Sequence, residues 1–386
     1  MGALPIESVR VFFPAFANGV IRLDGPGGSQ TPQPVLDAIT GYLSASNANL
    51  GGVFAASEAT GDLVAGARAA AAAFLGAASP AEVGFGFNAT SVNFNLSRAA
   101  TRDVVAGDEI VVTALDHDAN IAPWTQAAAD RGLVVKTVGL DGDGRLDMVA
   151  LAAAIGQRTR IVAFPYANNA TGTAVDVAAV VQLAHAAGAI AWADATHWAP
   201  HFPTVVGELG VDVAICSAYK FFGPHLGLFY VRERVADRWR PHQAAHAVAA
   251  PGAARFEHGT LAFEALAGLV AALEYVDSVG WAAIVDHERR LGQRFLDGLP
   301  DGIRLHGLPA MDGRTATFAL TVPGHAPVEV AKALASRGIA AGAGMFHAPA
   351  VFDALGITGG AVRVGFLHYH SEADVDATLT ALRSLV

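Results

Sequence analysis

The chain has 386 residues, of which 53% are apolar and 16% are charged, and its formal net charge is -10. A chain of this length and low charge predicts two folded domains and excludes intrinsic disorder. It has no block of basic residues, so we expect no binding to nucleic acid, which depends on neutralising phosphates.

Three further features of the sequence bear on the cellular compartment of the protein and on its contact with membranes. The single cysteine, Cys216, cannot form an internal disulfide, which favours a reducing cytoplasm. The first 19 residues lack the basic and apolar regions of a signal peptide. No apolar run continues for about 18 residues without a charged or polar interruption, so we expect no transmembrane helix and no membrane partner.

The middle of the chain alternates short β-branched runs with alanine-rich stretches. Strands are predicted at 109–113, 133–138, 160–166, 189–194 and 211–217. Helices are predicted between them at 121–131, 146–155 and 177–188, and Gly132 and Gly188 lie where a helix end favours glycine. This alternation is typical of a mostly parallel sheet covered on both faces, which binds ligands beyond the carboxyl ends of its strands.

The pattern changes after about residue 255. One long helix is predicted at 263–280, and shorter strands and helices follow it. We therefore expect an α/β fold with a large domain at 20–255 and a smaller α+β C-terminal domain at 256–386. Residues 1–19 are expected to join the smaller domain.

Two polar residues lie at the ends of predicted strands. Asp194 ends the strand at 189–194, and Lys220 follows the strand at 211–217. Such a pair can hold pyridoxal phosphate (PLP), since the amine forms a Schiff base with the aldehyde and the carboxylate keeps the pyridine nitrogen protonated. The pair therefore predicts a PLP enzyme whose substrate carries an amine.

Other loops offer further polar groups, each with a simpler alternative. Residues 88–91 begin a predicted helix and suit a phosphate, but they also suit an ordinary N-cap. His117 could lie flat on a pyridine ring or be a capping residue. Arg363 interrupts an apolar strand and needs an anion, either a substrate carboxylate or a salt-bridge partner.

Three patterns superficially resemble other kinds of site, and each is rejected. Asp194, His197 and His201 have the residue types of a metal site, but that interpretation leaves Lys220 unused, so we expect no metal. The glycine-rich segment 24–30 lacks the ending of a P-loop and is not a dinucleotide fingerprint. Residues 141–147 lack the closing ligands of a calcium loop and predict a tight turn.

Together these motifs resemble the class V aminotransferase family of PLP fold-type I enzymes, and within it the cysteine desulfurase and selenocysteine lyase branch. The segment LDGPGGSQTPQPVLDAI loosely resembles the branch's LDNAAT-like start, and HDANIAPW resembles its HHANIVPW-like loop. Its SNxxGT, DGAQ, SGHK and RFEAGT motifs are matched by NNATGT, DATH, SAYK and RFEHGT. Its RxSxxxYNTxEE-like end is matched by RVGFLHYHSEAD, so the resemblance runs in order from about residue 22 to 376.

The resemblance implies roles for particular residues. Lys220 would carry PLP and act in catalysis with Asp194 at the pyridine nitrogen and His117 stacked on the ring. Phosphate would be held by Ala89, Thr90, Ser217 and Tyr219. His197 would replace the usual glutamine near the ring hydroxyl, and Asn169 and Arg363 would take the substrate carboxylate. The family also implies a homodimer, in which Gly259 and Thr260 reach a phosphate in the neighbouring subunit.

One departure from the family changes the expected reaction. The desulfurases carry a sulfur-attacking cysteine on a mobile loop before the carboxylate-binding arginine, but residues 338–357 contain none. Cys216 lies inside a predicted strand, where we expect a buried core residue. The substrate pocket is expected to be lined by Phe346, His347 and the segment 198–201.

The sequence therefore predicts a PLP-dependent, desulfurase-like enzyme that removes a Cα proton with Lys220. The expected reaction is β-elimination at a carbon–sulfur bond, with His117 or His197 protonating the leaving group. Transamination or epimerisation through the same carbanion is the second hypothesis. A third is a catalytically idle subunit with a PLP fold.

Overall fold

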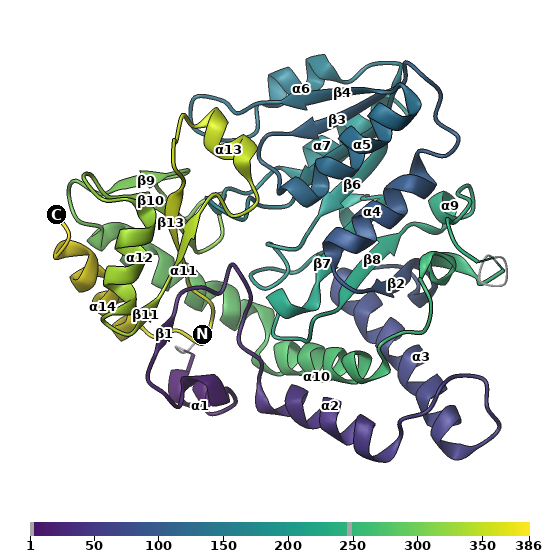
Figure 1. Cartoon of the computed structure of the whole chain (residues 1–386), viewed down its shortest axis with the longest axis horizontal. Helices are drawn as coiled ribbons and strands as arrows, with labels where there is room; N and C mark the ends of the chain where they lie inside the picture. The colour runs from purple at the N-terminus through teal and green to yellow at the C-terminus, as the bar shows by residue number, and fades with distance from the viewer. Residues whose placement is uncertain (1–3, 245–248) are drawn as a thin grey trace.

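The computed structural model describes residues 4–244 and 249–386 (Figure 1). Its largest sheet has seven strands in the order β2-β8-β7-β6-β5-β3-β4. These strands are β2 (Val83–Gly86), β3 (Glu109–Thr113), β4 (Val134–Val138), β5 (Thr159–Pro165), β6 (Ile190–Asp194), β7 (Val213–Ser217) and β8 (Gly227–Val231). Only the β8 pairings with β7 and β2 are antiparallel, which confirms the predicted mostly parallel sheet.

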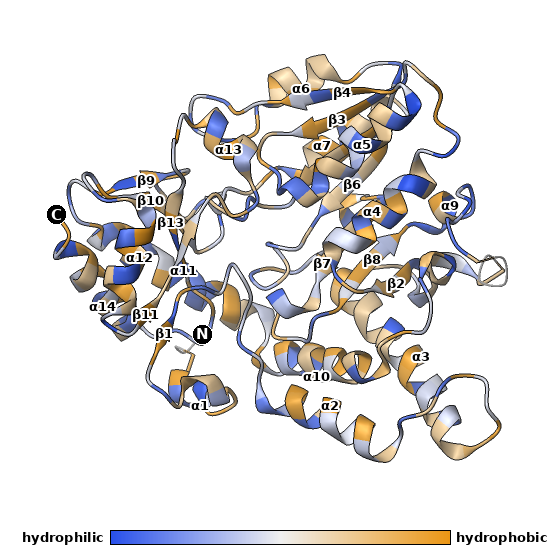
Figure 2. Cartoon of the chain, in the orientation of Figure 1, coloured by the Kyte–Doolittle hydropathy of each residue, from blue (hydrophilic) through white to orange (hydrophobic). Residues whose placement is uncertain are grey.

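Both faces of the inner strands are buried, because successive strand residues join different cores, whereas the edge strand β4 is partly exposed. Ile110 and Val112 pack into one apolar cluster with Trp124, whereas Val111 belongs to a second cluster on the other face. Figure 2 shows the middle of β3 in the apolar colour, as expected for a strand without a solvent face.

Helices cover the two faces and connect the strands. They are α2 (Gln33–Ala45), α3 (Ala55–Leu75), α4 (Ala89–Ala100), α5 (Ala122–Arg131), α6 (Met148–Ala154), α7 (Val177–Ala186), α8 (Val206–Leu209), α9 (Glu233–Ala236) and α10 (Phe263–Val279). Gly132 ends α5 in the left-handed conformation, with φ 69°, as predicted for a helix C-terminus. The predicted helices at 121–131, 146–155 and 177–188 are therefore confirmed within two residues at each end.

A second, antiparallel sheet of four strands lies beside the first (Figure 1), in the order β12-β13-β10-β9. Its strands are β9 (Arg304–His306), β10 (Thr317–Thr321), β12 (Gly342–Gly344) and β13 (Ala361–Gly365). The helices of this region are α11 (Trp281–Gly298), α12 (Pro327–Ala335), α13 (Pro349–Ala354) and α14 (Glu372–Arg383). A third apolar cluster fills the space between the sheet and α11, α12 and α14.

The N-terminal segment lies against the C-terminal part of the chain. After α1 (Ile6–Arg10), strand β1 (Ile21–Arg22) pairs in parallel with β11 (Ile339–Ala340). Helix α10 packs along α2 and α3, as Figure 1 shows. The proposed domain boundary between residues 255 and 256 stays a prediction.

The long helix predicted at 263–280 ends at Val279, and α11 begins two residues later. Gly280 lies between them, with φ 83°, and the two helix axes differ in direction by 75°. Within residues 4–244 and 249–386, no single helix has the length and apolar character needed to cross a membrane, and this bent pair meets those criteria only when combined.

The two sheets meet at a joint built from two loops. The backbone of Thr173 bridges to Arg314, and the N–H of Thr315 donates to the carbonyl of Gly172 at 2.9 Å. The buried Arg314 guanidinium donates to the carbonyls of Thr171, at 2.9 Å, and Thr317, at 2.6 Å. Gly172 has φ 77°, and a Cβ placed there would lie 2.5 Å from the Thr317 carbonyl oxygen, so the joint requires glycine.

Candidate active site

A cavity of about 1130 Å³ opens at the carboxyl ends of β5, β6 and β7, the edge predicted for a ligand. Most of the predicted site residues line it, namely Ala89, Thr90, His117, Asn169, Asp194, His197, Ser217, Tyr219, Lys220 and Arg363. The fold therefore brings together residues that are up to 274 positions apart in the sequence (363 − 89).

Lys220 ends a short 3₁₀ turn, Ala218–Lys220, directly after β7. Its ammonium group donates to the carbonyls of Pro26, at 2.6 Å, and Gly27, at 2.9 Å. Burial and the positive charge of Arg363 lower the pKa of Lys220 to about 7, against the opposing effect of Asp194. A substantial fraction of this amine is therefore neutral near pH 7, as a base or a nucleophile requires.

Asp194, the last residue of β6, is a buried carboxyl group on the same cavity. One of its oxygens accepts a hydrogen bond from the Thr196 N–H at 2.8 Å. Burial raises its pKa, while the Thr196 hydrogen bonds and the charge of Lys220 lower it. A buried carboxylate is stabilised by a cation beside it, so Asp194 fits the protonated ring nitrogen of PLP.

The sequence analysis missed a second buried carboxyl group on the cavity. Asp116 accepts hydrogen bonds from the Asn120 side chain, at 2.7 Å, and from the His117 N–H, at 3.0 Å. Burial and the negative charge of Asp194 raise its pKa well above the usual value. The sequence signal that could have indicated this residue was its position directly before the predicted site residue His117.

The N-terminus of α4 combines both roles considered for residues 88–91. The Asn88 side chain caps the helix by accepting from the Ser91 N–H at 2.8 Å. The next N–H group, that of Ala89, faces β7 and donates to the Ser217 hydroxyl at 2.8 Å. A helix N-terminus beside a hydroxyl group suits the phosphate of the cofactor. Tyr219 stacks on His225, another cavity residue that the sequence analysis missed, with ring centroids 4.9 Å apart.

Two histidines line the cavity in neutral form, the half-buried His117 and the buried His197. The His117 Nδ1 accepts from the Ala119 N–H at 3.0 Å, so this histidine both caps a turn and faces the cavity. Burial, followed by the charges of His347, Lys220 and Arg363, lowers its pKa to about 4. Burial also lowers the pKa of His197, whose Nε2 lies 3.2 Å from the Thr315 hydroxyl.

Arg363 lies on β13 and reaches across to the seven-stranded sheet. Its guanidinium donates to the Asn169 carbonyl at 2.8 Å and lies over the Phe346 ring, 4.1 Å from the centroid. Burial lowers its pKa to about 10, which the charges of Asp24 and Tyr219 oppose. This buried cation in a cavity suits a substrate carboxylate.

The glycine-rich segment 24–30, excluded above as a P-loop, forms part of the wall. Gly27 lines the cavity and, with Pro26, accepts the hydrogen bonds of Lys220. A Cβ at Gly27 would lie 3.5 Å from the Arg363 guanidinium, and one at Gly28 would lie 3.3 Å from the Tyr219 ring. The sequence signal that could have indicated this role was the match of the segment to the family's LDNAAT-like start.

Some predicted residues lie elsewhere. Gly259 and Thr260 are exposed outside this cavity, and Thr260 lines an apolar cavity next to it. The expectation that the segment 198–201 lines the substrate pocket is wrong for Trp198, which turns to a separate cavity and stacks on Phe202. It is also wrong for His201, which is buried away from this cavity. Its Nδ1 lies 2.6 Å from a carboxyl oxygen of the buried Glu288. Across the described ranges, no three His, Cys, Asp or Glu side chains are grouped as metal ligands.

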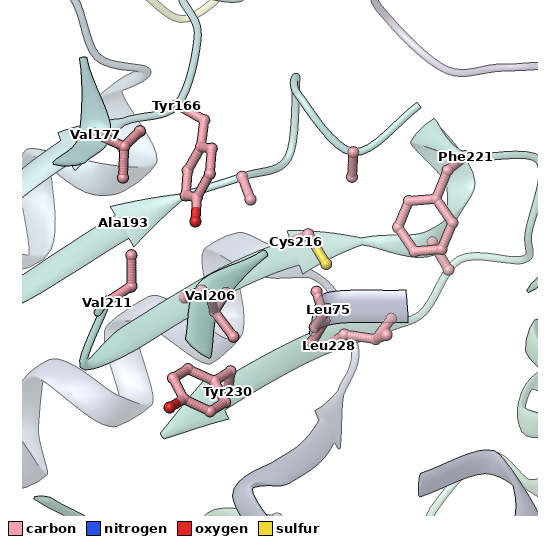
Figure 3. Close-up of a cluster of buried hydrophobic side chains, with 14 of the residues drawn as sticks. Leu75, Tyr166, Val177, Ala193, Val206, Val211, Cys216, Phe221, Leu228 and Tyr230 are labelled. Atoms are coloured by element: carbon pink, nitrogen blue, oxygen red, sulfur yellow. The ribbon is translucent and has the colours of Figure 1, made fainter. Parts of the chain in front are cut away.

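Cys216 is buried in an apolar core and does not line the cavity. Figure 3 shows its sulfur among apolar side chains that include Leu75, Phe221 and Leu228. Burial, followed by the charge of Asp194, raises the pKa of the thiol well above its usual value. The predicted core position is therefore confirmed, and the thiol is not the reactive thiolate that nucleophilic attack requires.

Comparisons with known proteins agree with this geometry. The family model described as aminotransferase class-V matches residues 21–378. A protein of Streptomyces coelicolor named "Probable cysteine desulfurase" is 32% identical, over 99% of this chain and 97% of that protein. "Probable cysteine desulfurase 1" of Mycobacterium leprae is also 32% identical, over 98% of this chain, and the match spans 65% of that protein.

Two solved structures are similar over their whole length. The apo cysteine desulfurase of Thermococcus onnurineus NA1 has a TM-score of 0.93 and 28% identity, with 100% of this chain and 99% of that chain covered. The cysteine desulfurase CsdA of Escherichia coli has a TM-score of 0.90 and 25% identity, with both chains fully covered. The chain therefore belongs to the class V aminotransferase family, as a PLP-dependent enzyme similar to cysteine desulfurases.

Proposed function

We propose that this protein is a carbon–sulfur lyase that acts on an amino acid by removing its Cα proton. The observation that carries the proposal is the Lys220 amine, with its pKa lowered to about 7, in one cavity with Asp194 and Arg363. When bound, PLP supplies an aldehyde for the substrate amine and a ring that accepts the electron pair left at Cα.

The side chains of the cavity have distinct roles in this proposal. Arg363, with Asn169 beside it, binds the substrate carboxylate and fixes the direction of the Cα–H bond. Lys220 is the general base that takes the Cα proton, and Asp194 holds the proton on the ring nitrogen. Ala89, Thr90, Ser217 and Tyr219 hold the phosphate, and His117 and His197 flank the ring.

The fate of the sulfur distinguishes this chain from a persulfide-forming desulfurase. Residues 338–357 contain no cysteine, and Cys216 is buried away from the cavity. We propose that the Cβ–S bond breaks, that its electron pair stays on sulfur, and that a proton completes the free thiol. Water then releases ammonia and a keto acid from the remaining three-carbon unit.

We also propose that the protein is a cytoplasmic homodimer. Support comes from the exposed positions of Gly259 and Thr260, which are available to a neighbouring subunit, and from Phe87, whose side chain is 69% exposed near the cavity. Sedimentation of the purified protein tests this assembly, and a monomer at micromolar concentration would contradict it.

The reaction is tested by measuring keto acid, ammonia and free thiol from a panel of amino acids. Equal amounts of the three products from cysteine or an S-alkylcysteine, and none from alanine, are the expected result. Keto acid from alanine with transfer of its amine would support transamination instead. Conversion of L-alanine into D-alanine would support epimerisation.

The role of Lys220 is tested by Lys220→Ala. We expect turnover to fall by about a thousandfold or more, since the carrier of the cofactor and the general base are both lost. Borohydride treatment followed by peptide mass spectrometry should find the cofactor on Lys220 in the wild type and on no residue of the variant. The exposed Lys332→Ala is the matched control. Cofactor on another lysine would contradict the assignment.

A further inference from the structure

The loop between β12 and α13 presents an imidazole at the mouth of the cavity. His347 is exposed and lines the cavity, with its ring centroid 5.6 Å from that of His117. The preceding residue, Phe346, lies under the Arg363 guanidinium. His347 therefore lies beside the histidine proposed to flank the cofactor ring, and it directly follows the residue that packs on the proposed carboxylate-binding arginine.

The backbone that carries this imidazole is held in place by two hydrogen bonds. The carbonyl of His347 accepts from the Asp118 N–H at 2.7 Å, and the carbonyl of Phe346 accepts from the Asn169 side chain at 2.8 Å. Phe346 and His347 have positive φ angles of 54° and 55°, which cost free energy in residues other than glycine. Two anchors to separate loops of the seven-stranded sheet offset this cost and fix the backbone from which the His347 side chain extends.

The other histidines near the proposed reaction are poor proton donors. Burial keeps His117 and His197 neutral, and His117 uses its Nδ1 to accept a backbone N–H. The remaining titratable groups on the cavity include Asp116, Asp118, Asp194, Tyr219, Lys220, His225 and Arg363. In contrast to His117 and His197, His347 combines exposure to water with a position next to Phe346, which packs on Arg363.

We propose that His347 is the general acid that protonates the departing sulfur of the substrate. When the Cβ–S bond breaks, the electron pair stays on sulfur, and a ring N–H of the His347 imidazolium donates its proton to that atom. The neutral imidazole then regains a proton from water. The inference rests on the proposed lyase function, and it assigns to His347 the step for which the sequence analysis named His117 or His197.

The test compares two leaving groups in His347→Asn. Asparagine tolerates positive φ, so the loop should keep its conformation. The exposed His325→Asn, on a turn outside the cavity, is the matched control. An S-alkylcysteine needs a proton on its departing thiolate, whereas β-chloroalanine releases chloride without one.

General acids contribute about 10²–10⁴ in rate, so we expect kcat for the S-alkylcysteine to fall at least about a hundredfold in His347→Asn. With β-chloroalanine it should stay within about threefold, and the control should match the wild type with both substrates. An equal loss with both substrates, or no loss with either, would overturn the acid role while leaving the lyase function intact. A wild-type protein that forms no keto acid from either substrate would overturn both proposals.

Discussion

Lys220 has the chemistry of a base because burial and Arg363 both disfavour its charged form. With a pKa near 7, the amine is mostly charged below that pH and mostly neutral above it. We expect labelling of Lys220 in cofactor-free protein by an amine-reactive acylating reagent to rise between about pH 6 and 8 and then level off. Quantitative peptide mass spectrometry gives the profile, with Lys332 as the internal reference. A Lys220 profile that still rises steeply above about pH 9 would show that the cavity does not lower the pKa.

Cys216 illustrates the opposite case, a reactive residue type in an unreactive place. We expect Cys216→Ala to keep cofactor uptake and keto-acid formation within about threefold of the wild type. The free energy of unfolding should fall by about 1–2 kcal/mol, because the variant leaves a small cavity in the apolar core. Urea unfolding measures this loss. A persulfide trapped on Cys216 after incubation with cysteine, together with lost turnover in the variant, would show that a sulfur relay exists.

Among the elements, most strands of the middle of the chain could be predicted because both of their faces are buried, and the exception is the partly exposed edge strand β4. Burial on both faces leaves continuous apolar runs, and a polar residue at the end of such a run, such as Asp194, is conspicuous. Strand β2 contains two glycines in four residues and was not predicted. Strand β8 was not predicted either. Its antiparallel direction follows from the short connection after β7, residues 218–226, which leaves no room for a crossover helix.

The loops of the site were predicted less completely than the strands. Gly27 has no side chain to suggest chemistry, because its contribution is a backbone carbonyl brought to Lys220 by the fold. Trp198 was placed on the wrong side because sequence proximity to His197 does not define direction within a turn. His347 was expected in the pocket, but its two backbone anchors depend on contacts across more than 170 residues (346 − 169 = 177).

At the scale of the whole molecule, the joint between the two sheets determines how Arg363 meets Asn169. We expect Gly172→Ala to lower the free energy of unfolding by about 3 kcal/mol or more, from the left-handed backbone and the close approach to Thr317. Gly188→Ala is the matched control, since Gly188 has φ 73° and a Cβ added there would meet no atom within 4 Å. This control should lose only about 1–2 kcal/mol. Thermal and urea unfolding measure both, and equal losses would show that the joint tolerates a side chain.

The two hydrogen bonds of Lys220 to the carbonyls of Pro26 and Gly27 have a kinetic consequence. A lysine whose amine donates to two carbonyls must release both bonds before this amine can react with an aldehyde from solution. Loading of the cofactor then includes the departure of the Lys220 amine from both carbonyls, and the loading rate should reach a plateau at high cofactor concentration. The frequency with which Lys220 leaves these two carbonyls, rather than diffusion, would thus determine how fast newly made protein becomes active.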